Sequence, residues 1–176
     1  MDGKLTALIS EEELKKRVRD LGKQISDDYR DKNPNLIVIS ILKGSVIFLS
    51  DLIRYMDIPL AIDFMIVSSY GEKTSTSGNV KIIKDLDINI SDYDLLIVED
   101  ILDSGYTLSK IIEILKTRNP KSLKVCALLD KPERRVSHVE LDYTGFVIED
   151  KFIVGYGLDY DEKYRNLPYI GVYDPS

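Results

Sequence analysis

The chain has 176 residues, and its 24 Lys and Arg against 30 Asp and Glu give a net charge of −6. This length suffices for one domain with a substantial core, and the acidic balance argues against an extended nucleic-acid surface. The chain has one cysteine, Cys126, so it cannot form an internal disulfide. The long apolar window at residues 36–53 contains Lys43 and Asp51 and is therefore not expected to span a membrane. No signal peptide is evident, and we expect a cytoplasmic protein.

The first half of the chain predicts helices that alternate with strands. A capping-box motif at Ser10 opens a helix to about Tyr29. Residues 36–41 form a continuous apolar run, which is typical of a strand buried on both faces of a sheet. Residues 45–55 then predict a helix, and residues 60–67 predict a further strand.

The second half continues this alternation after an irregular segment. Residues 69–79 are rich in Gly, Ser and Thr and have no apolar period, whereas residues 80–83 suit an edge strand. Residues 95–98 predict a buried strand, a helix follows from Leu108, and residues 123–129 predict another strand. Such alternation indicates an α/β protein with a mostly parallel twisted sheet flanked by helices.

The region after Gly145 changes to short strands and Tyr-rich loops. The chain contains no internal repeat and no flexible linker, so residues 1–176 are predicted to form a single domain.

The most specific motif spans residues 95–107. Glu99, Asp100 and Asp103 follow the apolar run and therefore lie at the carboxyl end of a strand, where open α/β sheets bind ligands. Residues 104–107 cross into the next helix, so their N–H groups and the helix dipole favour an anion. The motif thus pairs an anion pocket with carboxylates for hydroxyls or a metal.

The sequence Glu-Asp-Ile-x-Asp-Ser-Gly-x-Thr resembles the ribose-phosphate-binding signature of the purine phosphoribosyltransferases, in the form found in the hypoxanthine (hypoxanthine-guanine) enzymes. Further matches extend from Leu42 to Arg165. The alternative is an ordinary turn at the end of a sheet, with solvated acids. The combination of three acids, a hydroxyl, a glycine and a threonine in one short turn disfavours this alternative. The resemblance implies a type I phosphoribosyltransferase fold, with a core at about 30–140 and a small hood subdomain that includes about 145–176.

The resemblance also implies roles within the motif. Asp103 would be the catalytic general acid/base toward purine N7. Mg²⁺ would be held by Glu99 and Asp100, with Asp159 at a second ion. The residues implied in binding the 5-phosphoribosyl-1-pyrophosphate (PRPP) and its phosphate are Glu99, Asp100, Asp103, Ser104, Gly105, Tyr106 and Thr107.

Two other segments match parts of the family's pyrophosphate site. Lys43 and Gly44 match a pyrophosphate loop in which the peptide before the lysine is often cis, and Arg165 matches a pyrophosphate-contacting arginine. An ordinary strand-to-helix turn with a solvated lysine is the alternative for Lys43 and Gly44. Ser69 and Tyr70 begin a segment that resembles a mobile lid, with an idle surface loop as the alternative.

The purine would be recognised by residues of the second half. Lys131 matches a lysine that contacts the 6-oxo group, Phe152 would stack on the base, and the backbone of Ile153 would bond its pyrimidine edge. Without the resemblance, Lys131 would suit a solvated loop and Phe152 a core position. The neighbouring Arg134 and Arg135 are interpreted as solvated or interface charges.

The resemblance therefore implies a purine-salvage enzyme. It would transfer 5-phosphoribosyl from PRPP to hypoxanthine, and also to guanine, giving IMP or GMP and pyrophosphate. Mg²⁺ is the implied cofactor and a homodimer or homotetramer the implied assembly, with no nucleic-acid or membrane partner. Two alternatives remain open: a Mg-dependent nucleotide hydrolase, which lacks a Gly-x-x-x-x-Gly-Lys-Ser/Thr loop here, and an RNA-binding regulator of nucleotide synthesis, which would need a basic face.

Overall fold

The computed structural model describes residues 3–32, 35–69 and 80–174. Of the predicted lid, Ser69 ends a strand, whereas Tyr70 to Asn79 lie outside the described residues. The elements in chain order are β1 (Lys4–Ile9), α1 (Glu11–Arg30), β2 (Leu36–Leu42), α2 (Val46–Arg54), β3 (Ala61–Ser69), β4 (Val80–Lys84), β5 (Asp94–Leu102), α3 (Tyr106–Lys116), β6 (Ser122–Asp130), a 3-10 turn (Pro132–Arg134), β7 (Tyr143–Val147), β8 (Ile153–Val154) and β9 (Ile170–Asp174).

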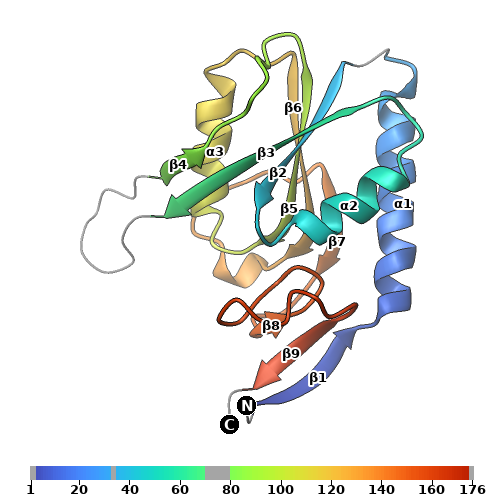
Figure 1. Ribbon diagram of the computed structural model, residues 1–176, viewed down its shortest axis with the longest axis vertical. Helices are drawn as coiled ribbons and strands as arrows, with labels where there is room; N and C mark the ends of the chain where they lie inside the picture. Colours follow the sequence, from blue (N-terminus) through green and yellow to red (C-terminus); the bar gives the residue numbers. More distant parts are fainter. Residues whose placement is uncertain (1–2, 33–34, 70–79, 175–176) are drawn as a thin grey trace.

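Six strands form the main sheet in the order β4-β3-β2-β5-β6-β7. All neighbouring pairs are parallel except β3 with β4, so the predicted mostly parallel sheet is confirmed. Its central strands β2 and β5 are buried apolar runs, as residues covered on both faces must be. Helices α1 and α2 cover the face that carries Leu96 and Val98, and α3 covers the face that carries Leu95 and Ile97 (Figure 1).

Local signals fixed the first helix as predicted. The side chain of Ser10 accepts the Glu13 N–H, and Glu13 Oε2 accepts the Ser10 N–H at 2.8 Å, which completes the capping box. The inner face of α1 is buried on the sheet together with the residues of α2. None of the helices in the described part of the chain is long and apolar enough to cross a membrane.

A second, antiparallel sheet has the order β1-β9-β8 and lies below the main sheet in Figure 1. The sequence did not indicate β1, which pairs Lys4–Ile9 with β9 at the other end of the chain. The predicted start of the hood at about 145 falls within β7, which pairs in parallel with β6 in the main sheet. The hood of the structure is thus this three-stranded sheet and the loops between β8 and β9, and the carboxyl ends of the main strands point toward it (Figure 1).

Candidate active site

The loop between β5 and α3 lines a cavity of about 140 Å³ at the carboxyl end of the sheet. Gly105 precedes the first turn of α3 with φ +76, and a Cβ at this position would overlap the Ser137 carbonyl oxygen. Only glycine suits this turn, because side chains rarely adopt that φ and the space is occupied. The residues lining the cavity are Glu99, Ile101, Leu102, Asp103, Ser104, Gly105, Thr107 and Leu108.

The two adjacent acids at the end of β5 have different surroundings. Glu99 lines the cavity beside the helix start, whereas Asp100 packs against the loop after β2, where a Cβ on Gly44 would overlap its carboxylate. Burial, together with repulsion from Asp100, raises the pKa of Glu99 well above its usual value. Burial raises the pKa of Asp100 to about 6, although Arg165 acts against this increase. A cation near either carboxylate would favour its charged form.

The loop after β2 carries the predicted pyrophosphate residues. The peptide bond Leu42–Lys43 is cis, and α2 begins directly after Ser45. The hood approaches this loop closely, because a Cβ on Gly157, whose φ is +103, would overlap the Gly44 carbonyl oxygen. The structure therefore brings Lys43 and Gly44 beside both Asp100 and the loop that follows β8.

Asp159 and Arg165 lie in that hood loop and form an ion pair of 2.9 Å. The second oxygen of Asp159 accepts the Glu162 N–H at 2.9 Å, and Arg165 Nη1 donates to the Gly157 carbonyl at 2.9 Å. Glu162 Oε2 lies 2.8 Å from Lys43 Nζ. Arg165 and Lys43, which were predicted to contact pyrophosphate, are thus joined through hood carboxylates.

The predicted purine residues meet where β6 ends and β8 begins. Lys131 is only 4% exposed, and its Nζ donates to the Lys151 carbonyl oxygen at 2.6 Å. The solvated-lysine alternative is therefore wrong. Phe152 is 50% exposed and meets Tyr160 edge to face at 5.5 Å, so the core alternative for this ring is also wrong. Ile153 is buried beneath it in β8.

Asp103 lies between the two cavities of the site. It lines the cavity of the β5–α3 loop and also a second one, of about 440 Å³, which it shares with Arg134 and Asp150. Its Oδ1 is buried without a hydrogen-bond partner in the structure, and Oδ2 lies 3.5 Å from Arg134 Nη1. A buried carboxylate oxygen without a partner is costly and suits a group that awaits a substrate proton.

Arg135 is a residue whose role the sequence did not show. It was interpreted as a solvated or interface charge, but it donates to the Asp103 and Leu102 carbonyl oxygens and pairs with Asp130. Two of these partners are backbone carbonyl oxygens. Because every residue type carries such an oxygen, no sequence motif indicates these contacts.

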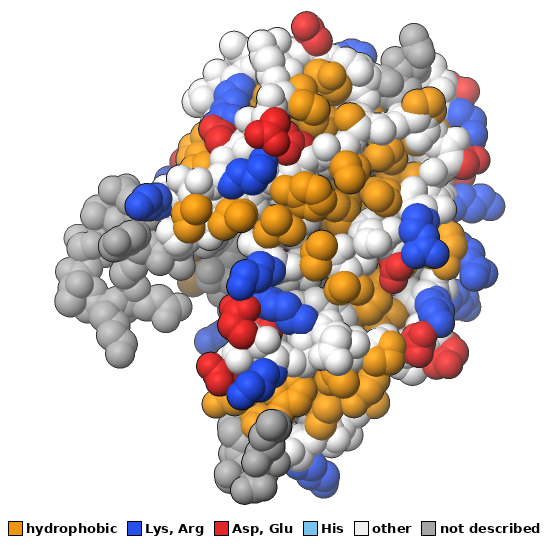
Figure 2. Space-filling view, in the orientation of Figure 1, with side chains coloured by type: hydrophobic (Ala, Val, Ile, Leu, Met, Phe, Trp, Pro, Cys, Tyr) orange, Lys and Arg blue, Asp and Glu red, His pale blue; other side chains and the backbone are white. Residues whose placement is uncertain are grey.

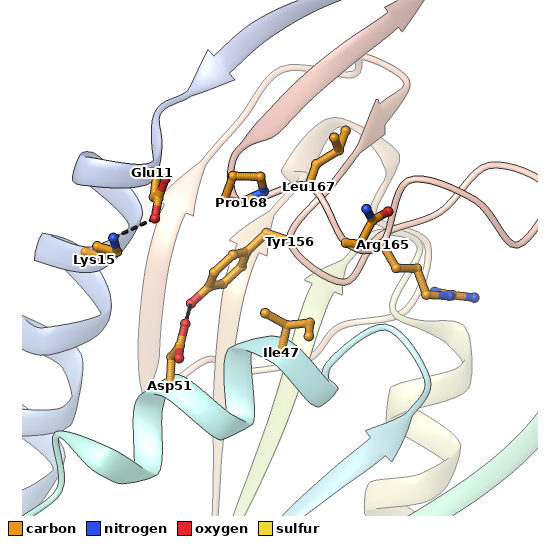
Figure 3. Close-up of a pocket in the computed structure, with 9 residues that line it drawn as sticks. Glu11, Lys15, Ile47, Asp51, Tyr156, Arg165, Leu167 and Pro168 are labelled. Atoms are coloured by element: carbon orange, nitrogen blue, oxygen red, sulfur yellow. Dashed lines mark hydrogen bonds and ion pairs between the residues drawn. The ribbon is translucent and has the colours of Figure 1, made fainter. Parts of the chain in front are cut away.

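A different cavity, of about 170 Å³, lies between α1, α2 and the hood (Figure 3). The Tyr156 hydroxyl points to Asp51 on α2 and donates to it at 2.7 Å, which ties the hood to the main sheet's helices. The Arg165 side chain extends away from Tyr156, toward Asp159 and Glu162 (Figure 3). This cavity therefore backs the candidate site but contains none of the signature acids.

The chain resembles known proteins over nearly all its length. Residues 6–161 match the family model described as "Phosphoribosyl transferase domain". A hypoxanthine-guanine phosphoribosyltransferase of Bacillus subtilis is 52% identical over 169 residues, which cover 96% of this chain and 93% of that protein. A hypoxanthine phosphoribosyltransferase of Escherichia coli is 51% identical, covering 93% of this chain and 92% of that one. Among solved structures, a Staphylococcus aureus hypoxanthine phosphoribosyltransferase is 50% identical with a TM-score of 0.91, covering 96% and 91% of the two chains.

Proposed function

Because the chain belongs to the phosphoribosyltransferase family, we propose that it transfers the 5-phosphoribosyl group from PRPP to hypoxanthine and guanine. The products are IMP or GMP and pyrophosphate, as expected of a purine-salvage enzyme. The observation that carries this proposal is the buried Lys131, whose Nζ bonds the carbonyl of Lys151, the residue before the exposed Phe152, and whose backbone N–H bonds the Leu102 carbonyl at the end of β5. A buried cation suits a 6-oxo group and would repel a 6-amino group.

Different residues of the site would bind different parts of PRPP. The first turn of α3, with Ser104 and Thr107, would bind the 5′-phosphate, and Lys43 and Arg165 would bind pyrophosphate. Glu99 and Asp100 would face the ribose hydroxyls. Bond breaking at C1′ develops positive charge on the sugar, so alignment and charge stabilisation matter more than a protein nucleophile.

The donor set at the strand end fits Mg²⁺. Glu99 and Asp100 are hard oxygen donors, and their pKa values are raised chiefly by burial, so a cation beside them would favour their charged forms. Within the described part of the chain, no three acidic, histidine or cysteine side chains form a complete metal cage. Mg²⁺ suits this, because it keeps water and substrate oxygens among its ligands. When bound, Mg²⁺ would neutralise charge on the pyrophosphate, and Asp159, which lies close enough to raise the pKa of Asp100, would hold a second ion.

Asp103 would exchange a proton with purine N7. Its carboxylate borders the cavity that Asp150 also lines, next to the residues proposed to hold the base. Water exclusion during the reaction would fall to the lid that begins at Ser69 and Tyr70.

Steady-state kinetics with hypoxanthine, guanine, xanthine and adenine, each with PRPP and Mg²⁺, tests the proposal. We expect turnover of hypoxanthine and guanine and at least a hundredfold lower kcat/KM for adenine, a difference of about 3 kcal/mol, because a charged hydrogen bond to the 6-oxo group is replaced by an N–H group facing the Lys131 ammonium. Equal turnover of adenine, or no turnover of any base, would contradict the proposal.

The comparisons give no support to a nucleotide hydrolase or to an RNA-binding regulator.

The assembly is proposed to be a homodimer or homotetramer. Hydrophobic side chains gather at the centre of the face in Figure 2, where α2 and β3 lie in Figure 1. The large exposed hydrophobic residues of these two elements and the turn after α2 are Val46, Ile47, Tyr55 and Ile62. A second copy of the chain is the partner proposed for this apolar face, because most oligomers are formed by identical subunits.

A further inference from the structure

Glu162 links the two cations that are proposed to bind pyrophosphate. Its Oε2 lies 2.8 Å from Lys43 Nζ, and its Oε1 lies 3.4 Å from Arg165 Nη2. Lys43 comes from the loop after β2, whereas Arg165 comes from the hood. One carboxylate therefore spans the gap between the two halves of the proposed pyrophosphate site.

The turn that carries Glu162 is built to present it. Asp161 and Glu162 both have positive φ, 53 and 60, a region that non-glycine residues seldom adopt. The Glu162 N–H is bonded to Asp159, and Tyr160 and Lys163 bridge the ends of the turn. The close approach of Gly157 to Gly44 fixes the hood loop against the loop of Lys43. These contacts place the turn that carries Glu162 next to the loop of Lys43.

The charges around this carboxylate balance without ligand. Lys43 and Arg165 contribute two positive charges, and Asp159 and Glu162 contribute two negative ones. Lys43 is the main cause of a lowered pKa at Glu162, so this side chain is ionised at neutral pH. Glu162 Oε2 takes one of the three donor positions of Lys43 Nζ, so a pyrophosphate oxygen must either displace this oxygen or share the ammonium group with it.

We propose that Glu162 is an internal anion that competes with pyrophosphate for Lys43 and Arg165. This rests on the proposed function and names a residue that sets how tightly the product is held. The Lys43 and Glu162 side chains are 67% and 65% exposed, so water reaches the pair and it opens readily. Such exposed pairs are weak, and displacing one lowers the affinity for the incoming anion about two- to fivefold.

The test is calorimetric binding of inorganic pyrophosphate with Mg²⁺ to the wild type and to Glu162→Gln. Glutamine keeps the shape of the side chain and loses the charge, so pyrophosphate should bind about two- to fivefold more tightly and leave more slowly. Tighter binding is a result that local misfolding does not produce. Asp161→Asn is the matched control, because Asp161 is 79% exposed and pairs with Lys163 at 3.5 Å, away from Lys43.

The outcomes separate this inference from the proposed function. Tighter binding in Glu162→Gln alone supports the competition. Unchanged or weaker binding in that variant, or an equal gain in Asp161→Asn, overturns it while the function stands. A wild type that binds no pyrophosphate overturns both. In a Lys43→Gln background the gain from Glu162→Gln should shrink, and a gain of full size there would contradict the role of Lys43.

Discussion

Arg135 Nε donates to the carbonyl oxygen of Asp103 at 3.0 Å. The same guanidinium bonds the Leu102 carbonyl and pairs with Asp130, so it joins the ends of β5 and β6. Holding the Asp103 backbone in this way leaves its carboxylate free to face the cavity beside Asp150. A rigid support of this kind suits the proton transfer proposed for Asp103.

Asp103→Asn should therefore lower the rate of the chemical step about 10²- to 10⁴-fold, because the amide keeps the shape but cannot accept the proton. Affinity for PRPP should stay nearly constant. Single-turnover rates are the proper measurement, since slow product release would mask the change in kcat. Asp20→Asn, on the exposed face of α1, is the control. A full single-turnover rate in Asp103→Asn would rule out its role as general base.

Lys131→Met should reduce kcat/KM for hypoxanthine by about 2 kcal/mol, or roughly thirtyfold, since a charged hydrogen bond to the 6-oxo group is lost. Discrimination against adenine should fall with it. Lys116→Met, at the exposed end of α3, should leave both values unchanged. If hypoxanthine turnover in Lys131→Met stays near the wild type, base choice resides elsewhere.

Thr107→Val should raise KM for PRPP about tenfold or more, because a hydroxyl bond to the charged 5′-phosphate is lost while the side-chain shape is kept. A substitution at Gly105 would be a poor test of phosphate binding. A side chain there would be strained at the positive φ and would overlap the Ser137 carbonyl, so the variant would disturb the fold itself. Thr117→Val, at the other end of α3, is the matched control. An unchanged KM in a folded Thr107→Val would exclude a phosphate contact by this hydroxyl.

The acids of β5 should lower stability at neutral pH without ligand. Their folded pKa values lie above the unfolded ones, so the folded state binds extra protons above about pH 4, and for Asp100 this window extends to about pH 6. Stability therefore falls as pH rises through this window and stays lower above it. Glu99→Gln with Asp100→Asn should be more stable at pH 7.5 by roughly 1–2 kcal/mol, allowing for water at these partly exposed groups.

Thermal unfolding without PRPP measures this difference, at about 2–4 °C for each kcal/mol in a chain of this length. The gain should vanish near pH 4, where the wild-type acids are protonated. Mg²⁺ with pyrophosphate should stabilise the wild type and have little effect on the double variant. A double variant that is less stable than the wild type at pH 7.5 would contradict the raised pKa values.

Ile62→Asp should dissociate the homodimer or homotetramer proposed above. The Ile62 side chain is 43% exposed on the apolar face of α2 and β3, and a charge there would be buried at the proposed subunit contact. Light scattering gives the assembly size. Val147→Asp, on β7 at the opposite edge of the sheet, should leave it unchanged. The same mass for Ile62→Asp and the wild type would place the contact on another face.

Local patterns predicted most of the main sheet. The apolar runs of β2 and β5 and the capping box of α1 act over a few residues, and each was found where the sequence indicated it. Pairing between the chain's two ends was not predictable, because β1 is largely exposed and its partner β9 lies more than 160 residues away.

The candidate site shows the same division. The signature motif predicted which acids gather at the end of β5, since strand, turn and helix follow one another in sequence. Arg135 and Glu162 were not predicted in their observed contacts. Arg135 bonds carbonyl oxygens, which every residue type carries. Glu162 lies in a turn of positive φ, but the sequence between Gly157 and Arg165 contains no glycine that would indicate such a turn.

The pairing of β1 with β9 has a consequence for the order of assembly during synthesis. The sheet's β2, β5 and β6 leave the ribosome well before Ile170–Asp174, and only that last strand can join β1 to β8. Phe152 and Ile153 therefore gain the support of β9 only after the strands of the main sheet have emerged. A nascent chain that stops before Ile170 should fold its main sheet and leave β8 without its partner strand.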